Sequence, residues 1–253
     1  MSERGSLTIA VPRGALLGET LDMLDGLGLD TVELRENDRK LLFEHVGVLG
    51  SSDGGGGTGA SGGGAGASVG VITMRPSDVP TYVEAGAADL GVTGKDVLLE
   101  QAGVEGQGGG GLRIYELLDL RYGGCTLVLA TAAGENAAGE HAAEEALRRL
   151  GVMRVATKYP RTAQRHFEQT GRQAEIVEVK GSVELAPLTG LAEAIVDLTA
   201  TGTTLRENGL VVREEIVHCT ARLIANPVAH KLKAGAIDDL LSRLRDGQTD
   251  TVV

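Results

Sequence analysis

The chain has 253 residues, which is enough to bury a substantial core in one large domain or two smaller ones. Aromatic residues make up only 2% of it, so its core must be built from aliphatic side chains. Its 24 Lys and Arg residues against 35 Asp and Glu residues give a formal charge of -11, which argues against sequence-independent nucleic-acid binding because such binding needs a basic footprint.

The start of the chain carries one short apolar run, residues 7–11, which is too short and too polar for a signal-peptide core. No stretch approaches the roughly 20 apolar residues of a membrane helix. The two cysteines, Cys125 and Cys219, are too few for a disulfide framework and lack the paired spacing of a zinc site. We therefore predict a soluble protein of the reducing cytoplasm.

Short apolar runs alternate along the chain with segments of helical period. The pattern predicts an α/β protein with largely parallel sheets. Strands are expected at residues 7–11, 31–34, 70–74, 90–92, 127–130, 154–157, 175–179, 194–197 and 216–225. Helices are expected from Ala15 to about Gly28, from Pro227 to about Arg245, and from starts near residues 75–78, 95, 140, 162, 181 and 203.

Residues 50–70 interrupt this pattern, because 11 of the 21 are glycine and the rest are mostly Ser, Ala and Thr. Such a segment cannot bury enough apolar surface to offset the entropy of ordering it, so we expect a flexible insert. It lacks the Gly-Lys-Ser/Thr ending of a phosphate loop and precedes a strand instead of a helix. A binding role is therefore disfavoured.

The strongest candidate site follows the strand predicted at 194–197, where Asp197 precedes a loop that leads into a helix. Backbone N–H groups and Thr hydroxyls at this spacing can surround a phosphate, while Asp197 can accept hydrogen bonds from sugar hydroxyls or hold Mg²⁺. The loop residues are Thr199, Ala200, Thr201, Gly202, Thr203 and Thr204. The alternative interpretation is an ordinary capped helix after a buried strand.

Four other turns have residue types that bind anions at the ends of strands or the starts of helices. Each has a plain alternative, a solvated cation or ordinary turn and helix-dipole chemistry. These turns contain Arg13; Gly94 and Lys95; Lys158, Tyr159 and Arg161; and Glu184. The five histidines form no metal-ligand pair, and no nucleophile signature occurs, so positioning and electrostatics are favoured over covalent catalysis.

Several separated segments stand out, among them Val11-Pro12-Arg13-Gly14, the Asp89-to-Asp96 turn, Tyr159-Pro160, and the loop after Asp197. In full, these segments are residues 11–14, 74–83, 88–96, 118–125, 155–160 and 181–210. Together they resemble ATP phosphoribosyltransferase, the first enzyme of histidine biosynthesis. In order and spacing they cover nearly the whole chain apart from the glycine-rich inserts.

The resemblance implies two α/β domains of the periplasmic-binding-protein type (type II-like) with an active-site cleft between them. Laid on this sequence, domain I comprises residues 1–119 and 225–253 with the flexible insert at about 50–70. Domain II comprises residues 120–224 and contains the phosphoribosyl-pyrophosphate loop. The expected reaction is attack by N1 of the adenine of ATP on 5-phosphoribosyl 1-pyrophosphate (PRPP), with loss of pyrophosphate.

The resemblance also implies roles for the candidate residues. Arg13, Lys158 and Asp197 are assigned to catalysis, and Mg²⁺ is expected on the leaving group, held by Asp197 or only through the substrate. The PRPP-binding residues are Asp197, Thr199, Ala200, Thr201, Gly202, Thr203 and Thr204. The ATP-binding residues are Arg13, Gly94, Lys95, Lys158, Tyr159, Arg161 and Glu184.

The chain resembles the short form of the family, because little sequence follows the last predicted helix. The expected partners are ATP, PRPP, further copies in a homodimer or higher oligomer, and a regulatory subunit resembling histidyl-tRNA synthetase. Two other functions remain open at this point. One is a small-anion binding protein with the same fold, and the other is a phosphoribosyltransferase that takes a free base, although most of those place two adjacent acids before the loop.

Overall fold

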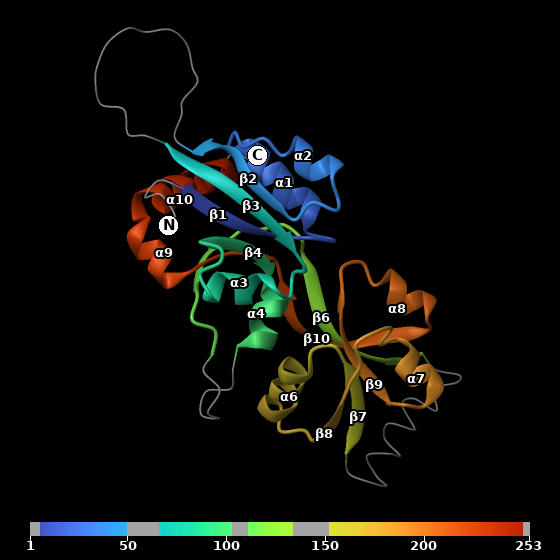
Figure 1. Cartoon of the computed structure of the whole chain (residues 1–253). Coiled ribbons are helices and arrows are strands. Elements are labelled where there is room, and N and C mark those ends of the chain that lie inside the picture. The colour runs from blue at the N-terminus through green and yellow to red at the C-terminus, as the bar shows by residue number, and fades with distance from the viewer. Residues whose placement is uncertain (1–5, 50–65, 103–110, 134–151, 250–253) are drawn as a thin grey trace, which may run out of the picture. The chain divides into compact units, whose positions relative to one another are not determined.

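The computed structural model describes residues 6–49, 66–102, 111–133 and 152–249. They form two units, each with its own sheet, shown in Figure 1. The first unit consists of residues 1–97, 104–123 and 221–253, and the second of residues 98–103 and 124–220. The domain limits predicted from the sequence, at 119/120 and 224/225, are a separate division of the chain and stay a prediction.

The sheet of the first unit has six strands in the order β2-β3-β1-β4-β11-β5. The strands β1, β3 and β4 are parallel, whereas β2, β5 and β11 pair antiparallel with their neighbours. In chain order the elements are β1 Ser6–Pro12, α1 Leu17–Gly26, α2 Val32–Glu36, β2 Leu42–Leu49, β3 Ala67–Met74, α3 Val79–Glu84, β4 Leu90–Gly94, α4 Lys95–Gln101, β5 Tyr115–Asp119, β11 Ala221–Ala225, α9 Pro227–Leu232 and α10 Ala234–Thr249, with α4 ending in the second unit.

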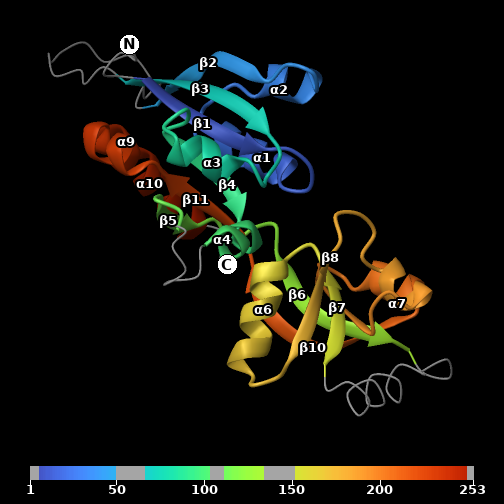
Figure 2. The same cartoon turned by 60° about the horizontal axis from the view of Figure 1, so that its bottom comes forward.

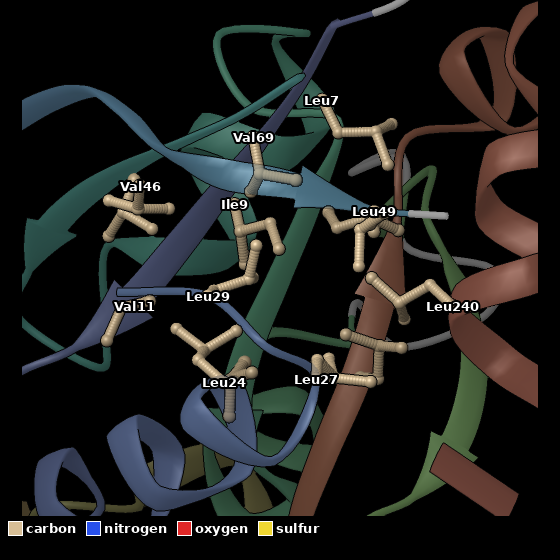
Figure 3. Packing of buried hydrophobic residues seen from close by; sticks show 14 of the residues in the cluster. Leu7, Ile9, Val11, Leu24, Leu27, Leu29, Val46, Leu49, Val69 and Leu240 are labelled. Carbon is tan, nitrogen blue, oxygen red and sulfur yellow. The ribbon is translucent and has the colours of Figure 1, made fainter. Parts of the chain in front are cut away.

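The core of the first unit lies between this sheet and the helices α1 and α10 (Figure 3). Alternate residues of β1, namely Leu7, Ile9 and Val11, point to this core, and Leu24 and Leu240 reach it from the two helices. All are almost fully buried. The core is aliphatic apart from Phe43, as the low aromatic content predicts.

The sheet of the second unit has five strands in the order β10-β6-β9-β7-β8. The strands β7, β8 and β9 are parallel to one another. Strand β6 pairs antiparallel with both of its neighbours, β9 and β10. Figure 2 shows α6 beside β7 and β8. The elements are β6 Cys125–Ala132, β7 Met153–Thr157, α6 Pro160–Gln169, β8 Ala174–Glu178, α7 Leu185–Thr189, β9 Ala194–Thr199, α8 Thr203–Glu207 and β10 Leu210–Cys219.

Several sequence predictions of local structure are wrong. Residues 31–34 form the N-cap and the start of helix α2 instead of a strand, and the run 216–225 is divided between β10 and β11, which belong to different sheets. The strands β2 and β5 were not predicted, and the sheets are mixed instead of largely parallel. The predicted glycine-rich insert lies outside the described residues at 50–65, while residues 67–70 belong to β3.

Within the described residues, no helix combines the length and the apolar character needed to cross a membrane.

Candidate functional site

The loop after β9 begins at a buried carboxylate. Asp197 is 8% exposed, and it lies in a strand whose preceding residues, Ala194 to Val196, are fully buried. Its Oδ1 accepts a hydrogen bond from the backbone N–H of Leu198 at 2.9 Å. The buried part of β9 therefore fixes one acidic side chain at the carboxyl end of a parallel strand, where α/β proteins place their ligands.

The loop itself is organised by its own hydroxyl groups. Thr199 Oγ1 accepts a hydrogen bond from Gly202 N at 2.8 Å, and the hydroxyls of Thr201 and Thr203 lie 2.9 Å apart. Gly202 has φ +71°, a left-handed conformation that favours glycine. Thr199 Oγ1 accepts and keeps its proton to donate, and one hydroxyl of the Thr201–Thr203 pair does the same, so these threonines can also serve a phosphate.

Arg206, on α8, holds the loop from the other side. Its guanidinium donates to the carbonyl of Thr201 at 3.0 Å and to Thr203 Oγ1 at 3.1 Å. No role is predicted for this arginine from the sequence. Its positive charge lies directly on the predicted phosphate loop.

The neighbouring strand β7 ends beside Asp197. Because Thr157 pairs with Val196 in the parallel register, Lys158 and Asp197 both follow at the same edge of the sheet. Lys158 Nζ lies 4.0 Å from Asp197 Oδ2, and the lysine side chain is 41% exposed. The structure therefore brings together two of the three residues predicted to be catalytic.

The charge state of Asp197 reflects this environment. Burial raises its pKa above the ordinary value of 3.8, and the field of Glu184 adds to the increase. The Leu198 N–H and the Lys158 ammonium act in the opposite direction. Glu184, which immediately precedes α7, is thus within electrostatic range of Asp197.

The start of α6 differs from the sequence prediction. The helix begins at Pro160 instead of near residue 162, and the carboxylate of Glu100 accepts hydrogen bonds from the backbone N–H groups of Arg161 and Thr162, both at 2.9 Å. Glu100 belongs to residues 98–103 of the same unit. A carboxylate of this chain therefore uses the N–H groups that would otherwise attract a substrate anion at this helix end.

Three predicted site residues lie in the first unit, at the carboxyl ends of β1 and β4. Arg13 donates through Nε to Thr73 Oγ1 at 3.1 Å and through Nη2 to the carbonyl of Lys40 at 3.0 Å. Lys95 forms an ion pair with Glu116 at 2.7 Å, and Gly94 is buried in β4 beside Asp96. Both cations are thus held in place by protein acceptors.

The donor set for a metal ion is small. No group of three or more His, Cys, Asp or Glu side chains that could hold a metal occurs among the residues that the structure describes. Asp197 supplies one carboxylate, and Mg²⁺ commonly binds through one or two carboxylates plus substrate phosphates. The residues present fit a magnesium ion whose remaining ligands come from a polyphosphate substrate and water.

Comparison with known proteins identifies the family. Residues 75–246 match the family model of ATP phosphoribosyltransferase. The chain is 47% identical to the ATP phosphoribosyltransferase of Rubrobacter xylanophilus over 96% of this chain and 97% of that protein. It is 41% identical to the enzyme of Acidithiobacillus ferrooxidans over 94% of this chain and 95% of that protein.

Solved structures agree with this assignment. The ATP phosphoribosyl transferase (HisG:HisZ) complex from Thermotoga maritima has a chain that matches with a TM-score of 0.66 and 29% identity, covering 95% of this chain and 97% of that one. A probable amino-acid ABC transporter extracellular-binding protein from Bacillus subtilis matches with a TM-score of 0.53 and 10% identity, over 97% of this chain and 93% of that one. The second likeness shows the fold alone and confirms the predicted periplasmic-binding-protein type. The chain belongs to the ATP phosphoribosyltransferase family.

Proposed function

We propose that the loop from Asp197 to Thr204 binds the ribose 5-phosphate part of PRPP in the family's reaction. That reaction condenses ATP with PRPP to give N1-(5-phosphoribosyl)-ATP and pyrophosphate, the first step of histidine biosynthesis. The observation that carries the assignment is the buried Asp197 carboxylate directly before a threonine loop, with Lys158 4.0 Å away. Asp197 accepts hydrogen bonds from ribose hydroxyls, and the loop donates to the phosphate.

The cations serve the polyphosphate chains. Lys158 lies beside the ribose acceptor Asp197, where positive charge stabilises the pyrophosphate as it leaves. Arg13 and Lys95 in the first unit, together with Gly94, bind ATP, as do Tyr159, Arg161 and Glu184 in the second. No protein nucleophile takes part, because the adenine N1 attacks the anomeric carbon directly and alignment supplies most of the catalysis.

Magnesium, where bound, neutralises the charge that develops on the departing pyrophosphate. Asp197 would hold the ion, directly or through the substrate. The chain's own contribution is to place this carboxylate beside Lys158 and to hold the ribose in line for attack.

One pair of variants tests the role of Asp197. PRPP is a polyanion, so removing a nearby negative charge should strengthen its binding unless that carboxylate contacts the ligand directly. Asp197→Asn is expected to weaken PRPP binding measured by calorimetry, because the amide loses acceptor capacity toward the ribose hydroxyls. The matched control is Glu193→Gln, which removes a carboxylate paired with Arg154 just before β9.

Turnover is measured with ATP, PRPP and Mg²⁺, and N1-ribosylated adenine nucleotide is detected by mass spectrometry. Unchanged or tighter PRPP binding in Asp197→Asn would contradict the assignment of this carboxylate. Absence of product from the wild-type chain, alone and with its regulatory partner, would contradict the activity itself.

The proposal also covers the proteins that this chain binds and the compartment in which it works. We infer a homodimer or higher oligomer in the cytoplasm and a separate regulatory subunit resembling histidyl-tRNA synthetase. The matching structure from Thermotoga maritima, which is a HisG:HisZ complex, supports the second subunit. The isolated chain should show little inhibition by histidine, and adding the subunit should confer it. Strong inhibition of the isolated chain by histidine would contradict this division of roles.

A further inference from the structure

Thr157 carries a buried hydroxyl group at the end of a strand whose other buried side chains are apolar. The side chain at the end of β7 is 0% exposed, and the two residues before it, Val155 and Ala156, are equally buried and apolar. Valine has nearly the same shape as threonine and a higher affinity for such an environment. A hydroxyl is stable there only when both its proton and its lone pairs have partners.

Both partners are backbone groups next to the predicted site. Thr157 Oγ1 donates to the carbonyl of Val196 at 2.6 Å and accepts from the N–H of Tyr159 at 2.8 Å. Val196 immediately precedes Asp197, and Tyr159 immediately follows Lys158. One buried hydroxyl therefore joins the strand that carries the acidic residue to the turn that carries the basic one.

This connection determines where the backbone of Lys158 lies. The Thr157 carbonyl also accepts from Val179 N at 2.9 Å, so Thr157 is tied to both neighbouring strands while its hydroxyl holds the turn that follows. The lysine side chain is long and 41% exposed, and the 4.0 Å approach to Asp197 is its only ion pair among the described residues. The 4.0 Å separation of its Nζ from Asp197 Oδ2 consequently depends on where the turn places its Cα atom.

We propose that Thr157 is a positioning residue for PRPP binding, which its hydroxyl supports by fixing the turn of Lys158 against the strand of Asp197. The inference rests on the proposed function of the loop after β9. Thr157 itself touches no substrate, because its side chain is fully enclosed. Its effect therefore passes through Lys158 and Asp197.

Three variants separate positioning from simple stabilisation. Thr157→Val keeps the shape and removes both hydrogen bonds, and Thr157→Ser keeps the hydroxyl and removes a methyl group. Thr131→Val is the matched control, because Thr131 is a buried threonine of the same sheet whose hydroxyl accepts from Arg213 Nε at 2.8 Å. Thr131 pairs with Ala194, at the end of β9 away from the loop.

The readouts are the melting temperature, the Kd for PRPP by calorimetry, and kcat and KM with both substrates. Thr157→Val should raise the Kd and the KM for PRPP about tenfold, the size of effect that losing one or two buried hydrogen bonds produces. Thr157→Ser should stay within about threefold of wild type. Both valine variants should melt at lower temperature, but Thr131→Val should leave the Kd unchanged.

The outcomes distinguish the two proposals. If the wild type binds PRPP and Thr157→Val binds it equally well while melting earlier, Thr157 has a structural role only and this inference is wrong. If the serine variant is as weak as the valine variant, the hydroxyl is not responsible. A wild-type chain that neither binds nor consumes PRPP refutes the proposed function. Should Thr157→Val not fold, Thr157→Ala takes its place in the same comparison.

Discussion

Replacing Gly202 tests whether the threonine loop needs its observed backbone conformation. Its φ of +71° costs a residue with a Cβ atom about 1–2 kcal/mol. The new Cβ atom would also lie 2.9 Å from Arg206 Nη1, so the guanidinium must shift, which weakens its hydrogen bonds to Thr201 and Thr203. At about 0.5–1.5 kcal/mol each, loss of both exposed bonds would add at most roughly 1–3 kcal/mol.

The chain offers a matched control at Gly190, which ends α7 with φ +74° and has no neighbouring atom within 4 Å of the place that a Cβ atom would take. Gly190→Ala carries the same backbone strain of about 1–2 kcal/mol without displacing a neighbour. Both alanine variants should fold, because a chain of this size loses about 2–4 °C in melting temperature per kcal/mol. Gly202→Ala should melt below Gly190→Ala.

Binding separates the two glycines further. We expect Gly202→Ala to weaken PRPP binding at least tenfold in calorimetry and Gly202→Val to abolish turnover, since the backbone can no longer approach the phosphate closely. Gly190→Ala should bind and turn over like the wild type. Equal PRPP affinity in folded Gly202→Val and wild type would remove this loop from the site.

The remaining predictions concern a side chain on the loop, the glycine-rich segment and a buried phenol. Arg206→Met should weaken PRPP binding while lowering the melting temperature only slightly. A lower melting temperature with unchanged PRPP binding would contradict a phosphate-binding role. Deleting residues 52–65, which ends before β3, should leave turnover nearly intact, since loop-closure entropy changes slowly with length, and a failure to fold would contradict that. Burial raises the pKa of Tyr122 to about 12. In a spectroscopic titration the wild type should therefore show one phenol that ionises only near that pH, and Tyr122→Phe should not show it.

Much of the fold follows from local sequence pattern. Apolar runs bounded by turn residues gave the correct positions of β1, β4, β6, β7, β8 and β9. The segment at 31–34 failed because its alternation of polar and apolar residues also suits a helix start. Thr31 Oγ1 donates to Asp25 at 2.6 Å and accepts from Arg35, and Val32 N donates to Asp30, so local side-chain bonds favour the helix.

The run at 216–225 failed for a different reason. It contains no Gly or Pro to interrupt it, yet the chain leaves one sheet at Cys219 and enters another at Ala221. Which sheet a strand joins depends on partners far away in the sequence, Leu127 and its neighbours for β10 and Val92 and its neighbours for β11. No local pattern contains that information.

The candidate site shows the same division. The loop after Asp197 could be predicted because its threonines and glycine are consecutive. Thr157 and Glu100 could not, because their partners lie 39 and about 61 residues away and only the tertiary fold brings them together. A threonine at the end of an otherwise apolar strand is a weak signal, since Thr is common in strands for its shape alone.

The burial of Asp197 has a consequence for stability that opposes its role in binding. Its folded-state pKa is raised above 3.8, chiefly by burial, so the folded chain binds this proton more tightly than the unfolded chain does. Stability from this group is therefore present at low pH and is lost as the pH rises through the folded-state pKa. At neutral pH the wild type carries the whole cost of the buried charge, and Asp197→Asn removes it.

Asp197→Asn should accordingly melt at higher temperature than the wild type at pH 7, although it binds PRPP less tightly. The difference should shrink as the pH falls and vanish below the ordinary pKa of 3.8, where the wild-type carboxyl is protonated in both states. Melting curves of both proteins across this range, without ligand, measure the effect. An asparagine variant that is less stable at pH 7 would show that the ion pair with Lys158 outweighs desolvation, and the carboxylate would then be a stabilising group instead of one retained for its ligand.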